Sequence, residues 1–195
     1  MKKLTLLFAL SVLVTVGATA QEFKKFRLAT GLGYAMPGGE GAGGGVLWAL
    51  EPGYRVNDAL AVSFKMEGAL IVRGFSESVE GYSGDVAGIS SYTANGIYYL
   101  SNNKFRPYVG AGFGIYSLAA VSMSSNGAGA AAESKIGFYP RIGFDLGHFN
   151  VNLDYNIVGA SEAIGTDFDG NIKKYDVKNS YIGIRIGGFF FGGRN

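Results

Sequence analysis

Charged side chains at six positions, each within an otherwise apolar or glycine-rich stretch, are the residues of this sequence best suited to chemistry. They are three acids and three bases, which we expect at similar depth once these stretches pair: Glu51, Lys65, Glu67, Arg141, Asp154 and Arg185. A buried charge must be paired, because its removal from water is otherwise strongly unfavourable. The set therefore predicts an interior network of salt bridges, with a gated, selective pore as the alternative interpretation.

Catalytic residues are scarce in this sequence. It has no cysteine, which excludes disulfides, thiol catalysis and thiolate metal sites. The only histidine, His148, is predicted in a short turn beside Phe149, away from the long loops where such a site would be expected. Asp145 and Glu51 have the chemistry of an acid–base pair, but nothing in their spacing singles them out. We therefore expect no enzyme activity, no cofactor and no metal site.

Three polar or glycine-rich segments resemble ligand loops without matching them. Asp167–Gly170 has its glycine at the fourth position of a calcium-type loop rather than the sixth, so Asp169–Gly170 is predicted to be a hairpin turn. Gly38–Gly45 lacks the Lys-Ser/Thr of a phosphate loop and is predicted to be a flexible loop. Residues 76–87 hold three acids and no base, so this loop is either solvated or meets cations that bridge lipopolysaccharide.

The elements that carry these residues read as strands, because apolar and polar side chains alternate with a period of two. The pattern is clearest in residues 60–73, 105–119 and 135–146. Including five weaker copies, we expect eight strands: residues 26–36, 45–55, 60–73, 88–100, 105–119, 135–146, 149–160 and 178–190.

The predicted connections alternate in length. Residues 56–59, 101–104 and 147–148 are tight turns, and the others are long loops: residues 37–44, 74–87, 120–133 and 161–177. Short turns at one end and longer loops at the other are typical of an outer-membrane barrel. The even strand number places both termini on the same side.

The face that carries charge is predicted to point inward. It is dominated by Gly, Ser, Ala and Tyr, which suit a narrow interior better than a solvated surface. The apolar face carries aromatic rings near the strand ends, as an interfacial girdle would: Tyr34, Tyr54, Tyr98, Phe105, Phe149 and Phe190. The alternative is a soluble barrel of the lipocalin type, with its apolar face inside. Inward glycines at positions such as 110, 112, 114, 137 and 143 are expected to leave local cavities.

The first twenty residues have the features of a secretory signal peptide. Lys2 and Lys3 precede an apolar core, and Ala18–Ala20 is a small-residue cleavage site. We therefore predict a signal peptide at residues 1–20 and one barrel domain at residues 21–195. Without the two lysines, the 17 basic residues fall to 15, which equals the 15 acidic ones. A neutral mature chain gives no electrostatic reason to bind nucleic acid.

Together the leader, Pro107–Gly114 and Tyr181–Phe191 resemble the small eight-stranded outer-membrane barrels of the OmpA, OmpX and OmpW type. The resemblance implies an all-β, antiparallel, up-and-down transmembrane barrel in a Gram-negative outer membrane, with periplasmic termini. It also implies contact with membrane lipid and lipopolysaccharide, a monomer, and recognition by the barrel-assembly machinery. Family members typically end on an aromatic residue. Here Gly192–Asn195 follows Phe191, so the assembly signal is expected within Tyr181–Phe191.

The fold itself specifies no activity, because many functions share it. The leading hypothesis is a non-enzymatic barrel that supports envelope integrity and presents loops outward. The alternatives are a narrow porin-like channel for small solutes, including apolar ones, and a surface protein that binds ligands or host cells through loops 74–87 and 161–177.

Overall fold

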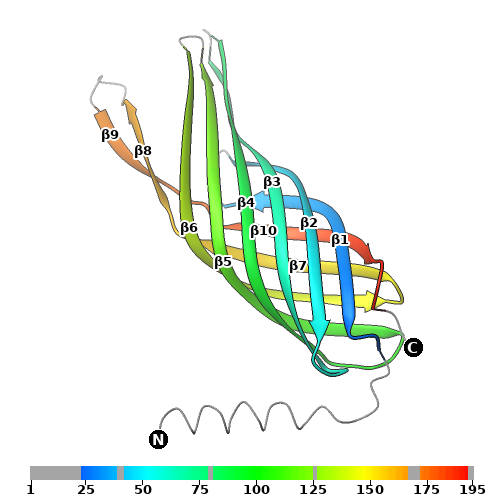
Figure 1. Ribbon diagram of the computed structural model, residues 1–195. Coiled ribbons are helices and arrows are strands. Elements are labelled where there is room, and N and C mark those ends of the chain that lie inside the picture. The colour runs from blue at the N-terminus through cyan, green and yellow to red at the C-terminus, as the bar shows by residue number, and fades with distance from the viewer. Residues whose placement is uncertain (1–22, 39–41, 79–80, 125–126, 167–171, 193–195) are drawn as a thin grey trace, which may run out of the picture.

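The computed structural model describes residues 23–38, 42–78, 81–124, 127–166 and 172–192. The predicted signal peptide and the predicted Asp169–Gly170 turn lie outside these residues. The described residues form ten antiparallel strands, and eight of these strands form a closed barrel (Figure 1). The barrel strands are β1 (Phe26–Pro37), β2 (Ala42–Arg55), β3 (Leu60–Ser78), β4 (Gly81–Tyr99), β5 (Phe105–Ser124), β6 (Gly127–Leu146), β7 (Phe149–Val158) and β10 (Tyr181–Phe189).

Closure of the barrel comes from pairing between its first and last strands. Each barrel strand pairs with its neighbour in sequence, β7 pairs with β10, and β1 pairs with both β2 and β10. Strands β8 (Ser161–Thr166) and β9 (Ile172–Val177) form a separate two-stranded sheet between β7 and β10. The prediction of an all-β, eight-stranded, antiparallel barrel is confirmed.

The predicted long loops are largely wrong, because the strands continue through them. β3 and β4 stay paired to Ser78 and Gly81, and β5 and β6 stay paired to Ser124 and Gly127. These segments are rich in Gly, Ala and Ser and contain no proline, so their backbones can extend the ladder although their side chains do not alternate. Residues 161–177 likewise contain the β8–β9 hairpin. Figure 1 shows β3–β6 continuing well past the ends of β1 and β2.

Apolar side chains face outward and polar ones inward along the barrel strands. Ile136 is 82% exposed and Phe113 is 66% exposed, whereas Lys65 on the interior face has no exposed surface. The six predicted girdle residues are all exposed. On β6 the outward-facing apolar residues run from Ile136 to Leu146, about the 9–11 residues that a tilted strand needs to cross a membrane. This arrangement is the inverse of a soluble barrel.

None of the described residues forms a helix of the length and hydropathy required to cross a membrane.

Candidate functional site

The barrel interior is filled by layers of side chains, and the layer nearest the long hairpins is apolar. Its members are almost fully buried and come from seven of the eight barrel strands: Ala35, Leu47, Ala69, Ile71, Ile89, Tyr116, Val158 and Tyr181. We call this set the apolar layer. It lies between the long-hairpin end and the interior charges. Two of its tyrosines reach the polar side chains next to it, because Tyr181 donates a hydrogen bond to Glu67 and Tyr116 donates one to Asn156.

The first group of charges lies next to the apolar layer and is organised around Glu67. This carboxylate accepts hydrogen bonds from Lys65 Nζ at 3.0 Å, from Tyr181 Oη at 2.6 Å, and from Arg185. Asp154 contacts the same two bases, with Lys65 Nζ at 3.5 Å, and also accepts from Asn156. Two acids and two bases therefore neutralise each other inside the barrel.

The second group pairs Arg141 with Glu51. Arg141 Nη1 lies 3.0 Å from both carboxylate oxygens of Glu51. Ser63 Oγ donates to Glu51 at 2.7 Å, and the other end of the Arg141 guanidinium donates to Asn152. Further hydrogen bonds continue through Tyr108, so each charge has several partners.

All six charged residues predicted from the sequence point into the barrel, and the structure brings them together in these two groups. Each of the six makes at least one ion pair with another member of the set. The sequence placed tyrosines on the interior face, but neither they nor the asparagines were predicted to take part in the charge network. Alternate positions of β7 carry Asn150, Asn152, Asp154 and Asn156, a period-two polar pattern that signals an interior-facing row.

The expectation that inward glycines leave cavities is wrong, because large side chains from neighbouring strands occupy the space. A Cβ at Gly112 would lie 2.6 Å from the Tyr139 ring, and one at Gly137 would lie 2.6 Å from the Tyr116 ring. Gly143 faces the Tyr108 ring in the same way. At these three positions the absence of a Cβ makes room for a tyrosine ring, and the ring fills the interior beside the glycine.

The barrel end that carries the turns 56–59, 101–104 and 147–148 holds a third set of charges. We call it the short-turn end. Asp145 there accepts from Arg27 Nη1 at 3.3 Å, Tyr99 Oη at 2.9 Å and Asn150 Nδ2 at 2.5 Å. Beyond this pair, the buried guanidinium groups of Arg55 and Arg106 lie 5.0 and 3.7 Å from the centre of the Phe23 ring.

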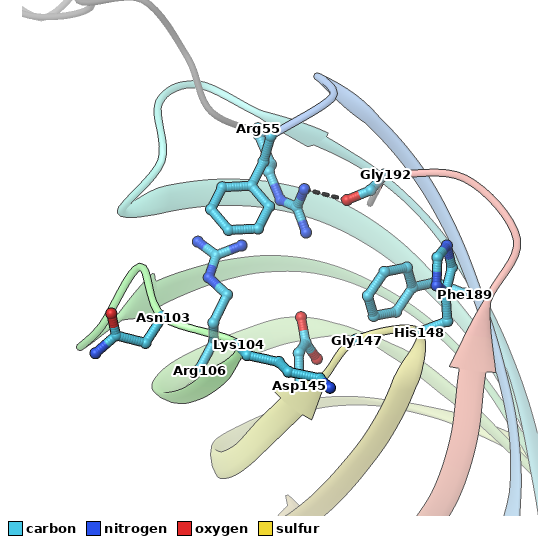
Figure 2. A pocket seen from close by; sticks show the side chains of 10 residues that line it. Arg55, Asn103, Lys104, Arg106, Asp145, Gly147, His148, Phe189 and Gly192 are labelled. Carbon is cyan, nitrogen blue, oxygen red and sulfur yellow. Dashed lines mark hydrogen bonds between the residues drawn. The ribbon is translucent and has the colours of Figure 1, made fainter. Parts of the chain in front are cut away.

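A cavity of about 370 Å³ opens at the short-turn end (Figure 2). Arg55 and Arg106 lie on one side of it, and His148 and Phe189 lie on the other, with their rings 5.4 Å apart. The predicted turn position of His148 is correct, and Gly147 beside it has the positive φ of 62° that the tight turn requires. The acid–base pair considered for Asp145 and Glu51 does not form, since each carboxylate is held by its own arginine.

The described residues contain no group of three or more His, Asp or Glu side chains that could hold a metal ion. The chemistry that the arrangement supports is electrostatic. Carboxylates and guanidinium groups are fixed in the interior, and cationic side chains are concentrated at the short-turn end.

Comparison with known proteins agrees with this geometry. A family model described as the outer membrane protein β-barrel domain matches residues 6–190. No curated protein sequence matches the chain.

Solved structures are similar at low sequence identity. The attachment invasion locus protein Ail of Yersinia pestis is 16% identical with a TM-score of 0.55, over 88% of this chain and 100% of that one. The Neisserial surface protein A is 17% identical with a TM-score of 0.52, over 89% of this chain and 99% of that one. OprG of Pseudomonas aeruginosa is 16% identical with a TM-score of 0.55, over 88% of this chain and 98% of that one. At these identities the likeness shows the fold alone.

Proposed function

This chain belongs to the outer membrane protein β-barrel domain family and is a small barrel of the bacterial outer membrane, and we propose that it acts there as a closed, non-enzymatic structural element. In this proposal the barrel stabilises the envelope and holds its long hairpins outside the cell. The short-turn end and both chain termini face the periplasm, as short turns do in barrels of this class.

The observation that carries the proposal is the filled interior. A permeant ion would have to pass the apolar layer, where Leu47, Ile71 and Tyr116 have no exposed surface. It would then meet two neutralised charge groups whose members are buried and mutually bonded. Eight strands enclose only enough space for side chains, and here the side chains use it. The same filling disfavours the channel hypothesis, which relied on space beside the inward glycines.

We expect the purified barrel to be electrically silent in planar bilayers at all voltages. The variant Tyr116→Ala with Tyr181→Ala removes two rings of the apolar layer but leaves both charge groups in place, so it should stay silent as well. Single-channel recording checks both, with heat-dependent gel mobility as the test that each variant is folded. Discrete openings in the unaltered protein would refute a closed barrel and restore the channel hypothesis.

A second candidate function is binding by the long hairpins. Strands β3–β6 have 19 or 20 residues each, about twice the length needed to cross the membrane, and the excess lies at the long-hairpin end. A barrel with only a structural role in the membrane does not need this extension. One structure of the similar barrel Ail holds the heparin analogue sucrose octasulfate, so a barrel of this fold can bind a ligand.

Shortening the hairpins should separate the two candidate functions. Residues 72–86 and 119–132 are each replaced by Asn-Gly, which joins residues that are already paired, Ile71 with Ala87 and Leu118 with Glu133. We expect this variant to insert and fold. Cells that carry it should keep their resistance to detergent if the structural role holds, and should lose binding to immobilised glycans or matrix if the binding role holds.

An epitope placed between β5 and β6 should be labelled on intact cells, and its failure to label would contradict the proposed orientation.

A further inference from the structure

Buried charge in the barrel interior is not balanced. Among the residues whose side chains the structure describes, six buried bases face four buried acids. The four acids are Glu51, Glu67, Asp145 and Asp154, and each is engaged by Arg27, Lys65, Arg141 or Arg185. The surplus is therefore local. It consists of Arg55 and Arg106, which form no ion pair with a described acid.

These two arginines also keep donors that have no partner. Arg55 is 1% exposed and Arg106 is 3% exposed, yet Arg55 Nε and Arg106 Nη1 make no hydrogen bond. Arg27 and Arg141 also keep unpartnered donors, but each of them is paired with a carboxylate. Arg55 Nη1 donates to the backbone carbonyls of Lys24 and Gly192, and Arg106 Nε and Nη2 donate to those of Ser101 and Asp58. A buried cationic donor without an acceptor is costly, and native proteins usually supply the missing partner from protein, water or a ligand.

Both arginines line the cavity at the short-turn end, although the two unpartnered nitrogens themselves are buried. Lys104 lies at its exposed rim and adds a third positive charge. Asp145 also lines the cavity, but its oxygens are already occupied by Arg27, Tyr99 and Asn150. Phe189 supplies an apolar wall on the opposite side (Figure 2). The volume of about 370 Å³ is in the range of small-ligand sites.

We propose that this cavity is a binding site for an oxyanion, a carboxylate or phosphate carried on a compact apolar body. The planar guanidinium forks of Arg55 and Arg106 suit such a group, because two parallel N–H donors match its oxygens. The body of the ligand packs against Phe189 and the turn at Gly147. The site faces the short-turn end, so its ligand comes from the compartment that this end meets.

Aromatic faces are the competing explanation for the two arginines. Arg106 lies 3.7 Å from the centre of the Phe23 ring and 4.0 Å from that of Tyr99, and Arg55 also lies over both rings. A ring face stabilises the charge of a guanidinium above its plane. It does not accept from the in-plane N–H groups, and those are the donors left without partners. An oxyanion in the cavity supplies the counter-charge that the two guanidinium groups lack, while the rings stay in place.

The test is titration of the folded full chain in detergent micelles with benzoate, with inorganic phosphate and with neutral benzyl alcohol. Amide chemical shifts near the cavity, such as those of Gly147 and Gly192, report binding. We expect saturable shifts with benzoate or phosphate, and none with benzyl alcohol. The stronger of the two anions identifies the group that the site takes, and added salt should weaken the binding.

Charge-matched variants assign the site. Arg55→Gln and Arg106→Gln should each weaken binding at least about tenfold, as expected for loss of a charge-assisted hydrogen bond. Lys25→Gln removes the same charge from an exposed side chain at the same end, outside the cavity lining, and should change affinity less than about twofold. If the glutamine variants do not fold, Arg106→Lys keeps the charge but lacks the fork and should still weaken binding. Linear, non-saturating shifts in the unaltered protein, or equal weakening by Lys25→Gln, would overturn the proposal.

Discussion

Replacing Glu67 by alanine is expected to lower the free energy of unfolding by about 3–5 kcal/mol, the cost of breaking a buried ion pair from one side. Glu67 is 3% exposed and accepts from Lys65, Tyr181 and Arg185. Without it, the two bases share Asp154 alone, so one positive charge in the dry interior has no counter-charge. The loss exceeds the value of any single contact, because it includes the desolvation of that charge.

Urea unfolding in lipid vesicles measures this effect. Trp48 is the only tryptophan and faces outward, so its fluorescence reports the transfer of the barrel from lipid to water. The matched control is Glu133→Ala, since Glu133 also pairs with a lysine, Lys135, at 2.5 Å but on the exposed part of β6. Hydrogen bonds from Lys135 and Ser161 hold the pKa of the Glu133 carboxyl below its usual value, so the control also removes an ionised acid.

We expect Glu133→Ala to leave the unfolding midpoint unchanged, because exposed ion pairs contribute little. The loss of unfolding free energy in Glu67→Gln should lie between those of Glu67→Ala and Glu133→Ala. The amide still accepts a hydrogen bond from Tyr181, but it carries no charge to balance Lys65 and Arg185. Equal losses from Glu67→Ala and Glu133→Ala would show that burial does not set the strength of the Glu67 contacts.

The sequence was sufficient to predict the barrel because lipid imposes a simple rule on it. Where a strand crosses the membrane, every second side chain must be apolar, as from Ile136 to Leu146. That constraint ends where the strand leaves the lipid. Between Ala119 and Ala132 the sequence no longer alternates, so periodicity is lost although backbone pairing continues. The extended hairpins were missed for this reason.

Pairing inside the barrel depends on quantities that a linear pattern does not contain. Lys65 and Asp154 are far apart in sequence and meet only because strand tilt and shear bring β3 and β7 to the same depth across the interior. The set of six charged residues was predictable from residue type and face, whereas their division into two groups was not. The short-turn end was missed because Arg55 and Arg106 stand at strand ends, where exposed bases are common.

Removing the Tyr139 ring is expected to cost about 3–5 kcal/mol of unfolding free energy, and the cost should depend on Gly112. The ring is fully buried, and its centre lies 4.0 Å from Lys65 Nζ. The Tyr139 hydroxyl donates a hydrogen bond to Asn95. It occupies the space that a side chain at its cross-strand partner Gly112 would need. Gly112→Val should therefore destabilise the barrel by about 1–3 kcal/mol through overpacking, although valine favours strands elsewhere.

The double variant, Gly112→Val with Tyr139→Ala, should be more stable than the sum of the two losses by about 1–3 kcal/mol, because the valine then fills part of the vacated space. Gly96 is the control, since it lies on the outward face of β4 and a Cβ there would meet nothing within 4 Å. Gly96→Val should change stability little and should add independently to Tyr139→Ala. Additive losses at Gly112 and Tyr139 would mean that the ring does not depend on the glycine. A coupling confined to this pair would show that the interior glycines serve to seat rings, which is how a glycine-rich barrel becomes a closed one.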